Sequence, residues 1–179
     1  MSLILETSSL RLKPILESEL DIFHRILVDS YVRRYLCDDR VLSVQQASEM
    51  LQESQKLFQE EKLGLWFIEI KNKAEIIGFV GLWYFFAENQ PQLAYALLPH
   101  ETKQGYATEA AARILDYSFQ ELNYNYLLAS CAPRSGSLRD RPNLESRQVA
   151  KRLGMKQVEE RIIKGNPIVF FRIDRQANV

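Results

Sequence analysis

The middle of the sequence changes from helical periodicity to three consecutive β-strand patterns. Leu65–Ile70 and Ile76–Phe86 are rich in β-branched and aromatic residues, and a short polar segment separates them. A Gln-Pro pair then turns the chain into a third such segment, Leu93–Leu98, which Pro99 ends. Segments of this length joined by short polar turns are typical of neighbouring antiparallel strands. The pattern therefore predicts an antiparallel meander of three strands.

Helical patterns and further strands lie on both sides of this meander. Before it, a strand at Leu10–Ile15 is followed by a helix that Ser18 can cap and by a longer helix from Ser43 to near Gly64. After it, we expect a helix, a strand, a second helix and a strand pair, at Ala107–Asn123, Tyr126–Cys131, Asn143–Leu153, Lys156–Ile163 and Ile168–Ile173. A chain of 179 residues with this order of elements predicts one α/β (α+β) domain, 1–179, built on a single central sheet.

The charge balance and the apolar pattern argue against several classes of function. Lys plus Arg (23) equals Asp plus Glu (23), so the formal net charge is zero, whereas nucleic-acid binders usually carry a basic excess. The sequence shows neither a signal-peptide pattern nor a run of about 20 apolar residues, so no membrane partner is expected. Only Cys37 and Cys131 are available for a disulfide, and a reducing cytoplasm is the expected location.

The stretch from Leu97 to Ala110 carries the strongest chemical signal. It has the pattern of a strand, a tight polar loop with one glycine, Gly105, and the first turn of a helix. The first backbone N–H groups of a helix have no partners within it, and the helix dipole adds positive potential, so this end suits a phosphate. Lys103 could add charge there, and Thr108 could donate a hydroxyl. The same connection is also common without a ligand, and the P-loop and dinucleotide patterns, which need more glycines, are absent.

The motif in this part of the chain resembles that of a known enzyme family. Tyr95–Pro99 leading to Gln104–Ala110 looks like the acetyl-CoA-binding motif of the GNAT superfamily of N-acetyltransferases, and is closest to the branch named for ribosomal-protein N-terminal acetyltransferases. The other segments that resemble this branch are Glu6–Leu12, Ile77–Leu82, Asn143–Ser146 and Val149–Met155. The likeness covers nearly the whole chain. It implies a single GNAT-like domain whose central sheet is mixed, mostly antiparallel and flanked by helices.

The resemblance also implies a cosubstrate, an acceptor and a set of site residues. Acetyl-CoA would donate its acetyl group to a primary amine that meets the thioester directly, with no metal required. The backbone of Leu97 and Leu98 would pair with the pantetheine arm, and Asn143 would hydrogen-bond the pantetheine or the start of its helix. Ser146 stands where the branch places a hydroxyl near the coenzyme sulfur, able to help protonate the departing thiolate. The pyrophosphate would be held by the backbone N–H groups of Lys103, Gln104, Gly105, Tyr106, Ala107 and Thr108.

The chain departs from the pattern of the branch at positions that matter for chemistry. Lys103 replaces a glycine of the pyrophosphate loop, and Gln92 replaces a glutamate on the preceding strand. A glutamine cannot accept a proton as a general base. Glu88 or His100 could act through water instead, or the amine could lose its proton to solvent. Elsewhere in the superfamily a tyrosine is the thiolate's acid, but that position is Ala150 here, which leaves only the serine named above.

Two further features leave alternatives open. The segment 133–142 is longer than in most relatives and holds three arginines and one aspartate. It could contact the ribose phosphate of the coenzyme or an acidic substrate, or it could be an exposed insertion without such a role. The aromatic residues Trp66, Trp83 and those at 84–86 could line an acceptor pocket, although aromatic residues on strands are more often core.

Three functions of different classes are compatible with these residues. The leading hypothesis is transfer of an acetyl group from acetyl-CoA to a primary amine, which could be a protein N-terminus, an amino sugar, an amino acid or a polyamine. The alternative, motivated by Gln92 and Ala150, is a non-catalytic acyl-CoA-binding or regulatory module. The third is an interaction domain that keeps the fold and binds no coenzyme. The identity of the amine and the oligomeric state stay open.

Overall fold

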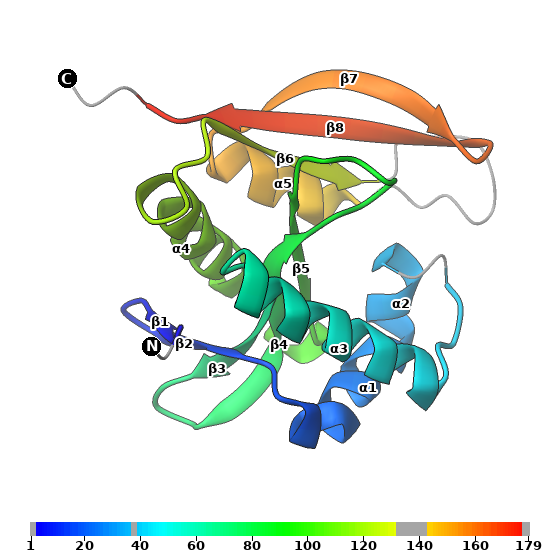
Figure 1. Ribbon diagram of the computed structural model, residues 1–179, viewed down its shortest axis with the longest axis vertical. Coiled ribbons are helices and arrows are strands. Elements are labelled where there is room, and N and C mark those ends of the chain that lie inside the picture. Colours follow the sequence, from blue (N-terminus) through cyan, green and yellow to red (C-terminus); the bar gives the residue numbers. More distant parts are fainter. Residues whose placement is uncertain (1–2, 37–38, 132–142, 177–179) are drawn as a thin grey trace.

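A computed structural model describes residues 3–36, 39–131 and 143–176 of the chain. At its centre lies an eight-stranded sheet in the order β1-β2-β3-β4-β5-β6-β8-β7 (Figure 1). The strands are β1 (Leu5–Glu6), β2 (Leu10–Pro14), β3 (Leu65–Ile70), β4 (Glu75–Trp83), β5 (Gln92–Leu97), β6 (Tyr126–Cys131), β7 (Lys156–Ile163) and β8 (Asn166–Asp174). The α-helices are α1 (Leu20–Val28), α2 (Ser30–Leu36), α3 (Val44–Glu60), α4 (Tyr106–Gln120) and α5 (Leu144–Arg152). No described helix combines the length and apolarity that crossing a membrane requires.

The sheet is antiparallel except where β5 meets β6. β3, β4 and β5 form the predicted meander, and β6, β8 and β7 form a second antiparallel group. β5 and β6 run parallel, and their described residues share one register pair, Gln92 with Leu128. Beyond that pair, Leu93–Leu97 and Ala129–Cys131 continue without pairing with each other, and we call this opening between the two strands the splay. The expected mixed, mostly antiparallel sheet flanked by helices is thus confirmed.

Side chains that alternate along the strands enter two hydrophobic clusters on opposite faces of the sheet. One cluster joins the sheet to α4 and α5 and includes Val80 and Ile114. The other joins it to α1 and α3 and includes Phe23 and Phe79, whose rings meet edge to face with centroids 5.4 Å apart. Val80 and Phe79 are neighbours in β4, so the period of two along the strand separates the clusters. The helices predicted on both sides of the meander therefore cover both faces.

Local hydrogen bonds decide where the first helices begin. Ser43 caps α3 as predicted, because its hydroxyl accepts from the backbone N–H of Gln46 at 3.2 Å and the Gln46 side chain accepts from the backbone N–H of Ser43 at 2.9 Å. The prediction that Ser18 caps α1 is wrong. A turn of 3-10 helix, Glu17–Glu19, precedes α1, and the Glu19 carboxylate accepts from Leu16 N at 3.0 Å instead.

Backbone conformation shortens two predicted elements. β4 ends at Trp83 rather than at Phe86, because Phe86 has a positive φ of 60°, which a strand does not allow. α3 ends at Glu60 rather than near Gly64, because Lys62 takes a left-handed φ of 63° just after the last turn.

The sequence analysis did not predict β1 or α2. β1 contains only two residues, too few for any periodicity. α2 is held at its start by Asp29, whose Oδ1 accepts from the backbone N–H groups of Tyr31 at 2.9 Å and Val32 at 3.2 Å. The aspartate ahead of the helix was the available signal.

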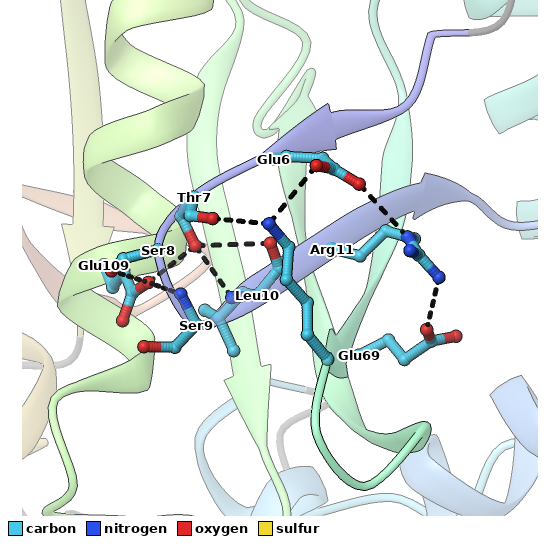
Figure 2. Close-up of polar contacts among 9 residues, drawn as sticks. Glu6, Thr7, Ser8, Ser9, Leu10, Arg11, Glu69 and Glu109 are labelled. Atoms are coloured by element: carbon cyan, nitrogen blue, oxygen red, sulfur yellow. Dashed lines mark hydrogen bonds and ion pairs between the residues drawn. The ribbon is translucent and has the colours of Figure 1, made fainter.

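The turn between β1 and β2 is fastened to the first turn of α4 (Figure 2). Glu109 Oε1 accepts hydrogen bonds from Thr7 Oγ1 at 2.5 Å, Ser8 Oγ at 3.1 Å and Ser9 N at 2.9 Å. We call these residues the N-terminal latch. Burial opposes ionisation of Glu109, but the hydrogen bonds from Thr7, Ser9 and Ser8 outweigh it and hold the pKa of this carboxyl below its ordinary value of 4.5.

We expect Glu109→Gln to lower stability at neutral pH and to flatten its dependence on acid. A carboxyl with a depressed folded-state pKa stabilises the fold above its unfolded pKa, and the contribution is lost as pH falls through the folded pKa. Urea denaturation at pH 7 should show a loss of about 1–3 kcal/mol, the size typical of hydrogen bonds to a charged group. At about pH 3 the variant and the parent should converge.

The matched control is Asp116→Asn, which removes an exposed carboxylate from the same helix. This variant should show no comparable change at either pH. An equal gap between Glu109→Gln and the parent at both pH values would contradict the assignment of the latch to the ionised carboxylate.

Candidate active site

The segment between β5 and α4 has a strongly curved backbone. A 3-10 turn, Pro99–Glu101, follows β5, and Lys103 then takes a left-handed φ of 65°. Gly105 is the N-cap of α4 with φ 90° and ψ −8°, a conformation that suits glycine. Lys103 thus adopts a conformation that favours glycine although it carries a side chain. The replacement noted in the sequence leaves the path of the loop intact.

The backbone N–H groups of residues 103–108 donate to no other group among the described residues. Glu109 has the first backbone N–H after this segment that forms a hydrogen bond, and it donates to the Gly105 carbonyl at 2.9 Å. The Thr108 hydroxyl is buried and also lacks a hydrogen-bond partner within the described parts of the chain. Unpaired N–H groups at a helix start, with the positive end of the helix dipole, form a site for an anion. The predicted pyrophosphate loop therefore has the free donors that it needs.

The buried side chain of Glu101 stabilises this loop through two polar contacts. It is 5% exposed, and its Oε2 accepts from Gln104 Nε2 at 2.8 Å. Its Oε1 lies 3.5 Å from Lys73 Nζ, at the β3–β4 turn. Gln104 at the exposed tip of the loop is thus tied to a buried carboxylate. The contact between Glu101 and Lys73 was not predicted, because it depends on the β3–β4 turn lying beside the loop.

Glu75, His100 and Glu101 bring potential metal-ligand atoms within 4.8 Å of one another, a grouping that the sequence analysis did not foresee. The carboxylate of Glu101 already contacts the Lys73 ammonium and the Gln104 amide. His100 Nε2 lies 3.5 Å from Glu75 Oε1. These contacts make the group a polar network at the base of the loop.

At the splay, Leu97 and Leu98 differ in what their backbone offers. Leu98 N donates to Ile77 O at 2.8 Å, and Leu98 O accepts from Glu101 N at 3.1 Å, so both groups are engaged. Leu97 lies opposite Gly78 in a pair that exchanges no backbone hydrogen bonds. Its N–H and C=O therefore point away from β4 and toward the splay. Of the two residues predicted to pair with pantetheine, Leu97 is the one whose backbone groups face an unpaired edge.

The start of α5 brings two hydroxyl groups together. Asn143 caps the helix, since its side-chain oxygen accepts from Ser146 N at 2.9 Å. The Ser146 hydroxyl lies 2.8 Å from the hydroxyl of Tyr95 on β5, and the same tyrosine donates to the Ser146 carbonyl at 3.1 Å. Burial raises the pKa of Tyr95 to about 12, so its hydroxyl keeps its proton at neutral pH. The sequence indicated Tyr95 only as part of a motif, and its contact with Ser146 was not predicted.

Gln92 is fully buried at the narrow end of the splay, at 0% exposure. Neither its side-chain oxygen nor its nitrogen has a hydrogen-bond partner within the described chain. The two residues considered as substitutes for a base are engaged elsewhere. Glu88 forms an ion pair with Arg161 of β7, and His100 lies past the opposite end of β5, beside Glu75.

A small apolar cavity of about 60 Å³ lies on the α1–α3 side of the sheet. Its lining includes Leu36, Met50, Phe79, Trp83, Phe85 and Ala94, from α2, α3, β4 and β5 and the segment after β4. Of the aromatic residues singled out in the sequence, Trp83 and Phe85 thus line a cavity. Trp66 is core, with no exposed surface, and its Nε1 donates to Leu3 O at 2.7 Å.

Other predicted features fall outside the site or outside the described residues. The arginine-rich segment 133–142 lies outside the described residues. Ala150 is buried in the α4–α5 cluster at 2% exposure. The Tyr31 hydroxyl of α2 contacts the carboxylate of Glu145, next to Ser146 on α5.

Comparisons with known proteins find similarity to acetyltransferases. The family model described as an acetyltransferase (GNAT) domain matches residues 9–156. The uncharacterized N-acetyltransferase YnaD of Bacillus subtilis (strain 168) is 32% identical over 94 residues, which span 51% of this chain and 51% of that relative. This chain therefore spans about half the length of that relative.

Solved structures share the fold at low sequence identity. An acetyltransferase from Agrobacterium tumefaciens superposes with a TM-score of 0.78 at 18% identity, covering 96% of this chain and 94% of that one. RimL, a ribosomal L7/L12 α-N-protein acetyltransferase in complex with coenzyme A, superposes with a TM-score of 0.77 at 16% identity, covering 96% and 97%. Because the family model matches most of its length, the chain belongs to the GNAT acetyltransferase family.

Proposed function

We propose that this protein transfers the acetyl group of acetyl-CoA to a primary amine, with residues 1–179 acting as one catalytic domain. GNAT acetyltransferases use acetyl-CoA, and the observation that carries the proposal is the row of free N–H groups at 103–108. These groups would hold the pyrophosphate at the start of α4, supported by the Glu101–Gln104 contact. The free backbone groups of Leu97 would pair with the pantetheine amides like an added strand.

The reaction would then take place in the splay. The amine nitrogen forms a bond to the acetyl carbonyl carbon, the C–S bond breaks, and the sulfur leaves as a thiolate with the bonding electrons. The thiolate takes the proton of Ser146 Oγ, the serine regains a proton from solvent, and the new amide nitrogen loses one to solvent. As negative charge develops on Ser146 Oγ, the Tyr95 hydroxyl 2.8 Å away would turn its proton from the Ser146 carbonyl to that oxygen and stabilise the charge. The protein mainly contributes positioning.

The acceptor of RimL, by its description, is the N-terminal α-amine of ribosomal protein L7/L12. For this chain the proposal is a primary amine. A second candidate, a non-catalytic acyl-CoA-binding module, is favoured by the absence of a titratable group on the side chain of Gln92. Release of free coenzyme A thiol with a broad amine panel separates the two. Acetyl-CoA binding without turnover on any amine would support the binding module.

Acetyl-CoA should raise the melting temperature of the parent protein, because a ligand that binds only the folded state stabilises it. Gly105→Ala should raise the acetyl-CoA dissociation constant about fivefold or more, since a left-handed residue with a Cβ costs about 1–2 kcal/mol and displaces the neighbouring N–H groups. A thermal-unfolding scan measures the first and isothermal titration calorimetry the second.

The matched variant is Lys103→Gly, which relieves the left-handed strain at φ 65° and keeps the backbone N–H. It should melt at a higher temperature, and its dissociation constant should stay within about threefold of the parent, a change of less than 1 kcal/mol. If Lys103→Gly weakened binding as much as Gly105→Ala, the lysine side chain rather than the main chain would be holding the phosphate.

Ser146→Ala should lower kcat about 100-fold, within the range for loss of a general acid, while the acetyl-CoA dissociation constant changes little. Tyr95→Phe should lower kcat by a smaller factor. In the double variant Tyr95→Phe should have no further effect, because the tyrosine acts through the serine. Steady-state kinetics of the four proteins test this. Independent, multiplicative effects of the two substitutions would refute the coupling.

A further inference from the structure

The unpartnered amide of Gln92 requires an explanation. Burying an amide without hydrogen bonds destabilises the folded chain, so such groups are uncommon in folded proteins. Gln92 has 0% exposure, and both polar atoms of its side chain lack a partner among the described residues. A group of this kind is satisfied either by ordered water or by a ligand that arrives later.

The position of Gln92 favours a ligand at the point where the acetyl group would be transferred. The residue forms the one described register pair between β5 and β6, so it lies at the apex of the splay. Along β5, Leu93 and Leu97 enter the α4–α5 cluster, whereas Ala96 packs against the α1–α3 cluster and Ala94 lines the apolar cavity. The period of two places Gln92 on the same face as Ala94.

The cavity and Gln92 share a neighbour. Trp83 is the register partner of Gln92 across β4 and β5 and also lines the cavity. α2 and α3 contribute Leu36 and Met50 to the wall of the cavity, and each side chain that lines it in the described structure is hydrophobic. One polar amide thus sits beside a small apolar space, an arrangement typical of sites that fix a polar group and hold an apolar substituent.

We propose that Gln92 and this cavity form the acceptor site, and that the acceptor is a primary amine with an uncharged, apolar substituent. The inference rests on the proposed acetyl transfer and specifies its second substrate. Gln92 Oε1 accepts a hydrogen bond from the amine N–H, which leaves the nitrogen lone pair free to attack the thioester carbonyl. The substituent enters the cavity beside Trp83 and Ala94.

The surrounding charges support an uncharged substituent. Glu88, in the segment between β4 and β5, is paired with Arg161, and Glu145, next to Ser146, is in contact with the Tyr31 hydroxyl. A carboxylate or a second ammonium on the acceptor would therefore lose its hydration in the cavity without gaining a charged partner. Acidic amines and polyamines are disfavoured on this ground.

The first test replaces Gln92 by methionine, which has a similar shape and no hydrogen-bonding amide. Removal of an unsatisfied buried amide should leave the melting temperature equal or higher. The acetyl-CoA dissociation constant should be unchanged, whereas kcat/KM for leucinamide should fall about tenfold or more, as expected for a lost hydrogen bond to the substrate. Unchanged kcat/KM in a stabilised Gln92→Met variant would show that water alone satisfies the amide and would overturn the proposal.

The second test fills the cavity with Ala94→Leu and compares three acceptors that share an α-amino amide. The parent should prefer leucinamide to isoglutamine, whose side chain is acidic, by about tenfold or more. Ala94→Leu should lower kcat/KM for leucinamide while sparing glycinamide, which has no side chain to place. Equal losses for leucinamide and glycinamide, or a parent that prefers isoglutamine, would refute the assignment of the cavity.

Different results would overturn the proposed function and the proposed acceptor class. A parent protein that shows no thermal shift with acetyl-CoA would contradict the proposed function itself. A parent that binds acetyl-CoA and acetylates isoglutamine or spermidine better than leucinamide would leave the acetyl transfer in place and overturn only the acceptor class.

Discussion

The site depends on a sheet that is left incomplete at its centre. β5 and β6 are paired at Gln92 and Leu128 and then continue apart, so the backbone N–H and C=O of Leu97 face a gap. Backbone polar groups inside a protein are nearly always paired, and a ligand with amides of its own can supply the missing strand. The starts of α4 and α5 lie around the same opening, and the latch, the Glu101–Gln104 contact and the Asn143 cap hold them there. The fold thus concentrates unpaired donors where two strands part.

Much of the fold followed from local patterns in the sequence. The meander, the helix that Ser43 begins and the loop ahead of α4 were predicted because their signals are local: β-branched runs, a capping serine, and one glycine between a strand and a helix. β1 and α2 were missed because their lengths of 2 and 7 residues carry little periodicity. The end of β4 was wrong because the left-handed backbone of Phe86 has no signature in residue type.

The site was only partly predictable, since its chemistry depends on contacts between distant segments. The motif pointed to the N–H groups at 103–108 and to Ser146, but the Tyr95 hydroxyl beside that serine joins residues 51 positions apart. The contrast between Leu97 and Leu98 became visible only once the register with β4 was known. Lys103 looked like a defect in the loop, yet its φ of 65° shows that the backbone keeps the turn that a glycine would make. The orphaned amide of Gln92 likewise required knowledge of its burial.

The N-terminal latch has a consequence for the order in which the chain is made and folded. Its three hydrogen bonds join residues separated by 100 to 102 positions. During synthesis at about 5–20 residues per second, Thr7 therefore waits roughly 5–20 seconds before Glu109 is even translated. The β1–β2 turn cannot be fastened until α4 has emerged, and a chain that stops short of α4 also lacks β6, so β5 is left as an open edge to chaperones and to other chains.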